Sequence, residues 1–466
     1  MPEESKSLSG ARKKSYEMTA LLATTLGSFL TPFMGSAINI AIRSIGDEFA
    51  VDTVTLSWIN MSYLLAAAVF LVPFGRIADI YGRKKTFIYG ILVYTASCIF
   101  SAVSLSAIFL IFSRILQGIG GAMIFGTGVA ILTSVFPAEK RGKALGINVA
   151  SVYSGLSLGP FIGGFLTQHF GWRSIFLAPV PLGLIIIVIT LWKLSGEWVE
   201  AKGEKFDLLG SIIYGVALIS LIYGLSILPE ISGIMLIFIA SSAFLAFILW
   251  ESNTKNPLLN LSLFRGNSVF TFSNLAALIN YSATFAVSFL LSLYLQYIKG
   301  FSAQDAGLIL MYQPVVQAIF SPLAGRLSDK IEPRIVASAG MAVTVTGLLL
   351  LTSLEEQTSI EFIAVTLVLL GFGFGLFSSP NTNAVMSSVK RKFYGVASAT
   401  LATMRLIGQT FSMGITTMIF TLYMGRVQIT PEYHPVFLES VTVAFTVFSV
   451  LCFIGIFASL VRGKVR

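Results

Sequence analysis

Long apolar runs separated by short polar segments make up most of the sequence after residue 18. A bilayer core of about 30 Å requires roughly 20 apolar residues in a helix, and fourteen runs have close to that length. The two runs that flank Leu228-Pro229-Glu230 are short enough to be half-membrane segments instead. The fourteen predicted helices cover residues 18–42, 56–77, 86–105, 107–134, 143–167, 173–194, 208–228, 232–250, 269–298, 306–327, 335–354, 360–388, 395–423 and 440–461.

The composition excludes the main alternatives to a membrane protein. Hydrophobic residues make up 55% of the 466 residues and charged residues 11%, whereas a soluble domain has about 25% charged residues. A soluble enzyme of this length would lack surface charge, and a disordered chain would contain fewer hydrophobic residues. The sequence therefore predicts an all-α integral membrane protein.

The basic residues predict the orientation of this protein in the membrane. The net charge is +9, and cytoplasmic loops carry an excess of Lys and Arg. With the N-terminus inside, 25 of the 31 basic residues fall in inner loops and tails, and Arg114 and Arg405 fall within helices. We expect both termini to be cytoplasmic, at the cell membrane, and no nucleic acid as a partner. The four basic residues placed outside are Arg43, Arg173, Lys299 and Arg426.

Neither the cysteines nor the N-terminus changes this interpretation. Cys98 and Cys452 both lie inside apolar runs, so a disulfide scaffold is not expected. The first apolar run begins near Met18, is longer than the apolar core of a signal peptide, and has no small-residue cleavage site. We expect it to be retained as the first helix.

A weak internal repeat divides the chain into two halves. Gly75-Arg-Ile-Ala-Asp79 recurs as Gly325-Arg-Leu-Ser-Asp329, and Gly118 and Gly142 recur as Gly371 and Gly395. Three pairs at nearly the same offset predict two pseudo-symmetric halves of six helices with two helices inserted between them. We expect six-helix bundles at 1–200 and 263–466 and the inserted helices at 201–262, an architecture that places a substrate site between the halves.

Four motifs, in order along the chain, resemble the major facilitator superfamily. Gly75-Arg-Ile-Ala-Asp-Ile-Tyr-Gly-Arg-Lys-Lys85 is similar to its loop between helices two and three, and Arg114-Ile-Leu-Gln-Gly-Ile-Gly-Gly121 to its fourth-helix motif. Gly155-Leu-Ser-Leu-Gly-Pro-Phe-Ile-Gly-Gly164 resembles the fifth-helix motif of antiporters. Trp172-Arg-Ser-Ile-Phe-Leu, followed by Pro181, resembles the start of helix six in the fourteen-helix drug:proton antiporter group.

This resemblance implies a major facilitator fold and a secondary active transporter that works by alternating access. The group exports small molecules in exchange for protons, so the expected partners are a small-molecule substrate, the lipid bilayer and protons, with the monomer as the working unit. The chain departs from the group in the first helix. Asn39-Ile-Ala41 matches the group, but Met34 stands where an Asp is common and Arg43 where a Pro is usual.

The repeated loop motif predicts a gating latch. A carboxylate is stabilised at the N-terminus of a helix by about 0.3–1 kcal/mol when exposed. We expect Asp79 to meet the helix that begins near Gly395, and Asp329 the helix that begins near Gly142, when the cytoplasmic side is closed. Plain anchoring of the basic loop is the alternative. The predicted latch residues are Gly75, Asp79, Gly82, Arg83, Gly325 and Asp329.

The fifth-helix motif predicts a close helix contact that slides during transport. Gly159 and Gly163 are four residues apart and share a face, and small residues let a neighbouring helix approach. Pro160 permits a kink because it lacks a backbone donor. Tight packing alone would explain the same residues. The motif residues are Gly155, Gly159, Pro160, Gly163 and Gly164.

Polar residues inside the predicted helices are candidates for the substrate cavity. A buried Arg is energetically costly unless it is paired or hydrated. No Asp or Glu lies deep in a predicted helix, so neither Arg114 nor Arg405 has an obvious salt-bridge partner there. Backbone carbonyls, Gln117, Gln409 or an anionic ligand would satisfy them, and each polar residue could instead simply join two helices. The candidates are Asn39, Tyr63, Arg114, Gln117, Asn280, Tyr281, Gln313, Gln317, Arg405 and Gln409.

No enzyme, metal or cofactor site is expected. His169 and His434 stand apart from other metal ligands, and Gly371-Phe-Gly-Phe-Gly375 lacks the Lys-Ser/Thr of a phosphate-binding loop. The leading prediction is proton-coupled export of small organic molecules. A transporter of an anionic or neutral metabolite is the second, because the chain has buried Arg but no deep acid. The third is a sensor with a transporter fold and no transport.

Overall fold

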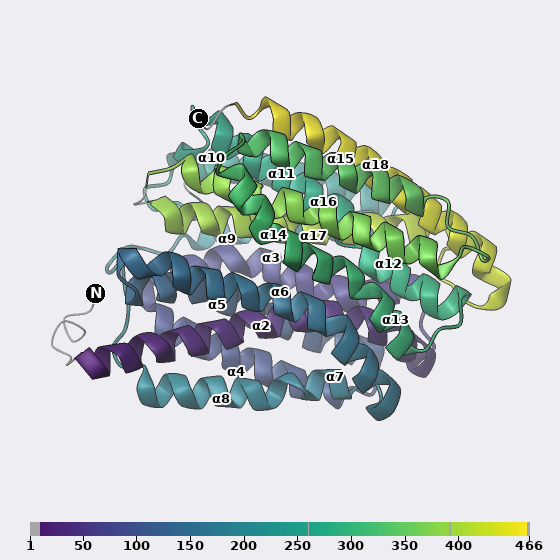
Figure 1. Ribbon diagram of the computed structural model, residues 1–466, viewed down its shortest axis with the longest axis horizontal. Helices are drawn as coiled ribbons and strands as arrows, with labels where there is room; N and C mark the ends of the chain where they lie inside the picture. The colour runs from purple at the N-terminus through teal and green to yellow at the C-terminus, as the bar shows by residue number, and fades with distance from the viewer. Residues whose placement is uncertain (1–9, 260, 391–392, 464–466) are drawn as a thin grey trace.

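The chain folds into a bundle of long α-helices that lie side by side (Figure 1). The computed structural model describes residues 10–259, 261–390 and 393–463, and these residues contain helices and no strand. The all-α prediction is confirmed. The beginning of the first helix and the end of the last lie at the same end of the bundle, on the left in Figure 1.

The helices follow the predicted apolar runs closely. The first six runs form α2 (Gly10–Phe49), α3 (Thr53–Tyr81), α4 (Arg83–Ala102), α5 (Ala107–Val135), α6 (Ala138–Phe170) and the pair α7 (Ser174–Leu177) and α8 (Pro179–Lys193). The inserted pair is α9 (Leu208–Ser226) and α10 (Ile231–Asn253). The rest form α11 (Ser268–Thr284), α12 (Val287–Leu293), α13 (Ala303–Leu310), α14 (Tyr312–Ser328), α15 (Pro333–Leu351), α16 (Ile360–Ser387), α17 (Tyr394–Tyr423) and α18 (His434–Val461).

Thirteen helical segments in the described residues are long and apolar enough to cross a bilayer. They correspond to thirteen of the fourteen predicted runs. The remaining run forms α17, which has 30 residues but is rich in Thr, Ser and Gly and carries Arg405. Its length and its place inside the bundle (Figure 1) make it the fourteenth helix.

Three runs that were expected to be single helices are interrupted. Residues 173–194 divide at Ala178, just before Pro179, which has no backbone N–H to donate. Residues 269–298 divide where the Ala286 N–H donates to the Ser412 hydroxyl, 3.0 Å away, instead of only to its own helix. Residues 306–327 divide at Met311, three residues before Pro314. Sequence periodicity does not show such breaks, because both pieces remain apolar.

The same helix contact occurs in both halves of the chain. Gly118 on α5 lies so close to α3 that a Cβ atom there would be 2.4 Å from the carbonyl oxygen of Tyr63. Gly371 on α16 lies equally close to α14, where a Cβ atom would be 2.4 Å from the carbonyl oxygen of Gln313. The glycine and its contact in the second half each come about 250 residues after their counterparts in the first half, which is the offset of the predicted repeat.

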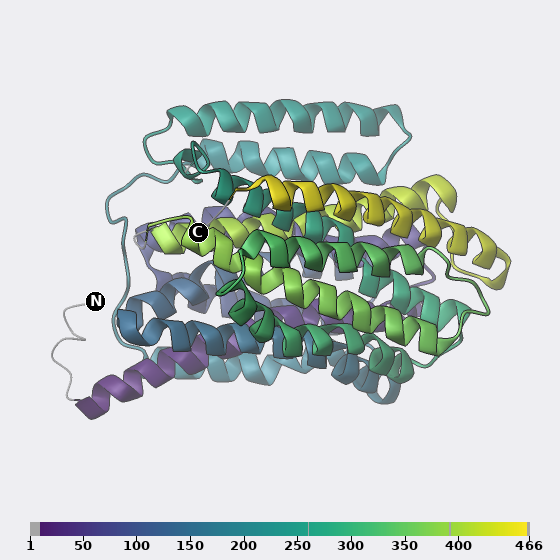
Figure 2. The same ribbon diagram turned by 45° about the horizontal axis from the view of Figure 1, so that its top comes forward.

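The inserted helices lie beside the two halves (Figure 2). On α9, the Tyr214 hydroxyl donates to the carbonyl of Ala68 on α3 over 3.1 Å, and the Ser226 carbonyl accepts from Thr421 on α17 over 3.0 Å. Helix α9 therefore contacts one helix from each half. Helix α10 packs on α9 and forms the outer edge of the molecule, at the top of Figure 2.

Candidate functional site

The two halves are joined at the end of the bundle where α2 ends and α13 begins, which we call the closed end. There Ser292 donates to the carbonyl of Asn39 over 2.5 Å, and the Gln296 amide donates to the carbonyl of Ile40 over 3.0 Å. Arg43 in turn donates to the carbonyl of Gln296. These bonds use backbone carbonyls of one half and side chains of the other, so they fix the register of the contact.

The predicted antiporter motif on α6 has two separate contact faces. Gly155, Gly159 and Gly163 lie against α2 in the same half, where Cβ atoms would come within 3 Å of α2 atoms. Gly164 and the Pro160 carbonyl face α13 of the other half. Gly159 and Gly163 share a face, as predicted, but this face packs against α2 of the same half. The next residue, Gly164, makes the contact with the other half.

Helices of different halves approach each other closely at α6 and α13. A Cβ atom on Gly307 of α13 would be 2.2 Å from the Pro160 carbonyl oxygen, and one on Gly164 would be 2.6 Å from the Ala303 carbonyl oxygen. His169, at the end of α6, lies 3.0 Å from the Gln304 side chain. The glycines are therefore required for the close approach of the halves at the closed end.

The contacts between the halves end at about half the length of α6. Among the described residues, the bond furthest from the closed end joins the Tyr153 hydroxyl on α6 to the Ser378 hydroxyl on α16, 3.0 Å apart. Beyond it, Gly142 and Gly146 on α6 and Gly395 on α17 have no atom within 4 Å of a Cβ position. The hydrogen bonds found between the halves thus lie between the closed end and the middle of α6. The opposite end, where these glycines have free space around them, we call the open end.

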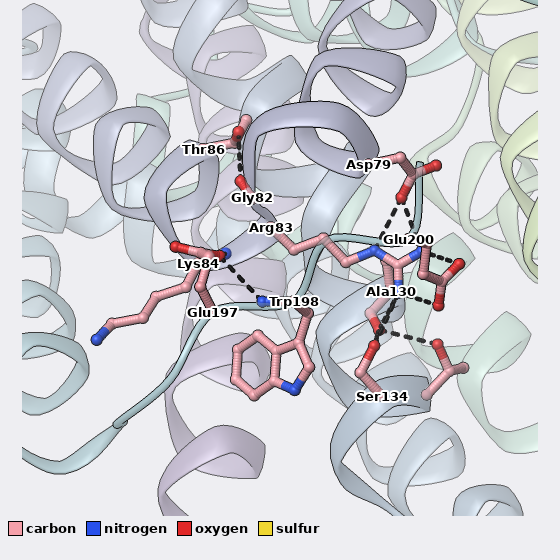
Figure 3. Close-up of polar contacts among 11 residues, drawn as sticks. Asp79, Gly82, Arg83, Lys84, Thr86, Ala130, Ser134, Glu197, Trp198 and Glu200 are labelled. Atoms are coloured by element: carbon pink, nitrogen blue, oxygen red, sulfur yellow. Dashed lines mark hydrogen bonds and ion pairs between the residues drawn. The ribbon is translucent and has the colours of Figure 1, made fainter. Parts of the chain in front are cut away.

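The loop between α3 and α4 lies at the open end, and residues beside it form an ionic network around a buried arginine (Figure 3). Arg83 is only 6% exposed and donates to Asp79 over 2.7 and 2.9 Å. The same guanidinium donates to Ser134 on α5 over 2.7 Å and to Glu200 over 2.8 Å. A buried arginine with two carboxylates and a hydroxyl has its charge and most of its donors satisfied.

The segment between α8 and α9 covers this loop. The sequence pattern did not predict this contact. Glu197 accepts from the backbone N–H groups of Lys84, over 2.7 Å, and Lys85, over 3.2 Å, and so caps the start of α4. Gly82 has a φ of 127°, which favours glycine, and a Cβ there would be 2.5 Å from the Glu197 side chain. Acidic residues in an otherwise basic inner segment were the available signal.

The remaining predicted latch residues make contacts within their own halves. Asp329 accepts from Asn383 on α16 over 3.2 Å, and a Cβ on Gly325 would be 2.7 Å from the Ser379 hydroxyl. Gly75 has no atom within 4 Å of a Cβ position. The predicted contacts of Asp79 near Gly395 and of Asp329 near Gly142 are not among those of the described residues in this conformation.

The Trp172-Arg173 motif binds the end of α2. The Trp172 indole donates to Glu48 over 2.6 Å, and Arg173 donates to both carboxylate oxygens of Glu48 over 2.6 and 2.7 Å. The Glu48 carboxylate raises the pKa of Arg173 above its usual value by accepting these bonds. The motif therefore fastens the start of the sixth spanning segment to the end of the first.

Four of the predicted cavity residues lie buried inside the first half. Arg114 is fully buried, donates to the carbonyl of Ile59 over 3.2 Å and to Gln117, and lies over the Tyr63 ring at 4.6 Å from its centroid. Asn39 accepts from the amide of Asn60 over 2.6 Å. Arg114 thus bonds to a backbone carbonyl and to Gln117, as expected for an arginine packed inside one half, while its Nη2 has no partner among the described residues.

Arg405 lies in a different environment, on α17, a helix that packs against α11 of its own half and against α3 of the first half. Its guanidinium donates to Thr382 over 2.6 Å and lies 5.6 Å from the centroid of the Tyr281 ring. Its side chain is half-buried, and its Nε has no partner. The Tyr281 ring packs edge-on against Phe374. This group, Tyr281, Phe374, Thr382 and Arg405, is referred to below as the Arg405 cluster.

The other candidates are distributed between packing and boundary positions. Asn280 is fully buried beside Cys452 of α18, and Gln317 is 6% exposed. Gln313 and Gln409 are half-buried, and the Gln313 side-chain oxygen lacks a hydrogen-bond donor. Gln409 was one of several possible partners for Arg405, which instead donates to Thr382.

The two arginines inside the spanning helices have no acidic partner in the described part of the chain. The ion pairs found there join Arg43, Arg76, Arg83, Lys140 and Arg173 to carboxylates, and none includes Arg114 or Arg405. This agrees with the prediction from the sequence. Within the described residues, the Arg405 cluster therefore combines aromatic rings with a positive charge that has no acidic partner, on a helix that also packs against the first half.

Another arginine, Arg462, is buried just after α18 and was not among the predicted site residues. It is fully buried and donates to Asn381 on α16 over 2.9 Å and to Ser273 on α11 over 3.3 Å. Burial lowers its pKa to about 10. Its bonds hold the end of α18 against the second half, which is a structural role.

The comparisons with known proteins agree with this arrangement. The family model described as Major Facilitator Superfamily matches residues 24–273 and again residues 273–465. The chain is 27% identical over 436 residues to the riboflavin transporter RibZ of Clostridioides difficile, covering 94% of this chain and 95% of that protein. It is 30% identical over 405 residues to the multidrug resistance protein Stp of Mycobacterium tuberculosis, covering 86% and 75%.

Two further similarities concern export and the fold. The tetracenomycin C resistance and export protein of Streptomyces glaucescens is 27% identical over 412 residues, covering 87% of this chain and 76% of that protein. Among solved structures, a bacterial homolog to the human lysosomal transporter Spinster, in an inward-facing and unoccupied conformation, has a TM-score of 0.69. That structure is 16% identical, covers 96% of this chain and 97% of its own, and shows a shared fold.

Proposed function

The chain belongs to the major facilitator superfamily, and we propose that it exports small organic molecules by alternating access, driven by a proton gradient. As a member of that family it is a multi-pass membrane transporter of small molecules and not an enzyme. The observation that carries the proposal is the one-sided contact between its halves. A closed end and an open end on either side of the Arg405 cluster form one of the two states that alternating access requires.

The proposed domain boundaries are residues 1–200, 201–262 and 263–466. A second recurring contact supports them. A Cβ on Gly155 of α6 would be 2.7 Å from the Phe29 carbonyl oxygen, and one on Gly408 of α17 would be 2.5 Å from the Leu278 carbonyl oxygen. Each bundle therefore repeats the same helix pairings, as two related halves require.

The closed end faces the outside of the cell in this proposal. The distribution of basic residues supports an orientation in the plasma membrane with both termini in the cytoplasm, and the halves then open toward the cytoplasm. We expect the monomer to be the working unit, since each chain has both halves. A reporter fused after Arg466 should be active only in the cytoplasm, and activity outside would reverse the orientation.

The chemistry of the Arg405 cluster favours a neutral or anionic aromatic cargo. The guanidinium, which has no acidic partner among the described residues, repels a permanent cation, and the half-buried Tyr281 ring beside Arg405 and Phe374 favours an aromatic cargo. A relative named as a riboflavin transporter and another named for resistance and export of an antibiotic are compatible with such cargo. Coupling to protons would then use an acid at a helix end or a proton carried on the substrate.

Transport in vesicles tests this function directly. The purified full-length chain is reconstituted in liposomes, and fluorescent neutral, anionic and quaternary ammonium aromatic compounds are supplied with and without a pH gradient. We expect gradient-dependent transport of a neutral or anionic compound. Transport of the quaternary ammonium compound alone would contradict the cargo, and no transport of any compound in a broad panel would contradict the function.

The Asp79 loop is proposed to act as a latch that closes the cytoplasmic side. In this open-end conformation Asp79 binds Arg83 and not another helix, so the latch would form only after closure. Asp79→Asn should slow transport several-fold and leave folding intact, because Arg83 keeps its bonds to Ser134 and Glu200.

Cysteine labelling checks this prediction. Ala150 lies on α6, almost one turn from Tyr153 toward the open end, and is exposed. A cysteine at Ala150 should react faster with a cytoplasmic thiol reagent in Asp79→Asn than in the parent. Asp305→Asn, a change at the closed end, is the matched control and should have no effect. Unchanged labelling together with unchanged transport in Asp79→Asn would exclude the latch.

A further inference from the structure

Two buried carboxyl groups meet at the open end of the inserted helices. Asp207 directly precedes α9 and is 9% exposed, and Glu251 lies in the last turn of α10 and is 3% exposed. A Cβ atom on Gly210 would be 2.4 Å from Asp207 Oδ2 and 2.8 Å from Glu251 Oε1. These two distances limit the separation of the two oxygens to about 5 Å, within the range where like charges disfavour each other.

All but one of the hydrogen-bonding positions of this pair have donors. Asp207 accepts from the backbone N–H of Gly210 over 2.9 Å and from the Trp250 indole over 2.9 and 3.1 Å. Glu251 Oε2 accepts from the backbone N–H of Leu259 over 3.0 Å. Glu251 Oε1, in contrast, is buried without a donor. An ionised carboxylate oxygen in that position would lose its hydration, and no hydrogen bond from the protein would replace it.

No cation compensates the pair within the described residues. None of the ion pairs found there includes Asp207 or Glu251. The nearby lysines in sequence, Lys205 and Lys255, are exposed. Tyr214, about two helical turns after Asp207 along α9, donates its hydroxyl to the Ala68 carbonyl and not to the pair.

The described charged groups closest in sequence to the pair are Lys202, Lys205 and Lys255, which are exposed, and Glu204, which binds Arg76 of α3. The helices that pack against α9 also carry Asp79, which binds Arg83, and Arg405, which binds Thr382. Two negative charges in a buried site without a counterion are strongly unfavourable. Addition of one proton removes one charge and supplies the donor that Oε1 lacks.

We propose that Asp207 and Glu251 form a proton-binding site in which the two carboxyl groups share one proton. Glu251 Oε1, the oxygen of the pair that is buried without a donor, carries the proton and faces Asp207 Oδ2 within about 5 Å. A metal ion is a poorer occupant, because the remaining carboxylate oxygens already accept from backbone or indole donors and would not complete a coordination shell. The site is separate from the Arg405 cluster.

The proton has a structural consequence at the cytoplasmic side. Asp207 caps α9, which contacts both halves, and Glu251 holds Leu259 in the connection that leads to α11 of the second half. When the proton leaves, repulsion between the two carboxylates loosens this connection. The site thereby links protonation to the attachment of the inserted helices, and its part in transport rests on the function proposed above.

Cysteine labelling of the full-length protein in liposomes tests the site without a transport measurement. Leu258 packs against the hydrophobic core beside Leu259. In Leu258→Cys, maleimide labelling relative to an exposed Lys202→Cys reference should rise at least about fivefold between pH 6 and pH 9 as the proton is lost. The reference corrects for ionisation of the thiol itself.

The variant Glu251→Gln separates the proton from other effects of pH. Its amide has nearly the same shape and donates to Asp207 permanently, so labelling of Leu258→Cys should stay low at every pH. The matched control Glu230→Gln, an exposed acid at the other end of α10, should keep the pH dependence. Asp207→Asn should also remove the pH dependence. Agreement between the two variants would show that the effect does not come from a folding defect in one of them.

Two results would overturn the proton site. One is labelling that does not change with pH in the parent, and the other is an equal change in Glu251→Gln. Replacing choline by sodium at fixed pH should have no effect, and a sodium effect equal to that of acidification would assign the site to sodium instead. A failure of transport in the parent protein would contradict the proposed function but leave this labelling result standing.

Discussion

Arg405→Ala should abolish transport of the natural cargo, while the protein still inserts and folds. The guanidinium is half-buried, and among the described residues Thr382 alone accepts a hydrogen bond from it. Its removal therefore leaves no described buried acid without a counterion. Loss of hydrogen bonds to a charged group costs about 1.5–3 kcal/mol, which corresponds to roughly a 10- to 150-fold loss in binding of a cargo that contacts it. Initial rates of uptake in liposomes over a range of cargo concentrations measure this loss.

Two companion variants separate charge from geometry at this position. Arg405→Lys keeps the charge but not the planar guanidinium, so it should retain part of the activity. Thr382→Ala removes only the hydroxyl that positions Arg405 and should reduce activity by a few fold. Full transport in Arg405→Ala, or robust export of a quaternary ammonium dye by that variant, would show that the cluster does not select the cargo.

Gly307→Ala should prevent closure of the closed end. A Cβ at Gly307 would be 2.2 Å from the Pro160 carbonyl oxygen, where real Cβ atoms do not approach below 3.0 Å, so α13 and α6 must separate. The halves then lose the register of their contacts, and transport should fall at least about tenfold, because a cost of about 1.4 kcal/mol in one state shifts the equilibrium tenfold. Transport rates in liposomes measure the loss.

A labelled cysteine reports the same change at the closed end. Ser292 is fully buried where it donates to Asn39, so a cysteine at Ser292 should react with an impermeant external reagent only when this end opens. Labelling should rise in Gly307→Ala. Gly146→Ala is the matched control, since no atom lies within 4 Å of its Cβ position. Equal behaviour of the two alanine variants would exclude a special role for the close contact.

The sequence predicted the helices because their lengths and apolar composition are set locally by the thickness of the bilayer. It did not predict the breaks at Ala178, Ala286 and Met311. At Ala286 the Ser412 hydroxyl, 126 residues away, bonds to a backbone N–H of the interrupted helix. Such a partner is defined by the tertiary fold, and no window of the sequence contains it.

The candidate site was predicted unevenly for the same reason. Polarity inside a helix marked Arg114 and Arg405 alike. Only the fold distinguishes them, because Arg114 donates to Ile59 and Gln117 inside the first half, whereas Arg405 donates to Thr382 and lies on α17, which also packs against α3. Glu251 was not among the residues that the sequence marked as candidates, yet it is buried against Asp207. Its burial depends on the pairing of α9 with α10.

The distance between the halves at both ends of the bundle tests alternating access most directly. Spin labels on exposed positions of α6 and α13 report the closed end, and labels on α6 and α17 report the open end. The pairs are Gln168→Cys with Asp305→Cys and Lys143→Cys with Val396→Cys. When cargo is added and the pH is changed, double electron–electron resonance should show the distance at the closed end increasing while the distance at the open end decreases. Distances that stay fixed under all conditions, or that increase together, would contradict the account.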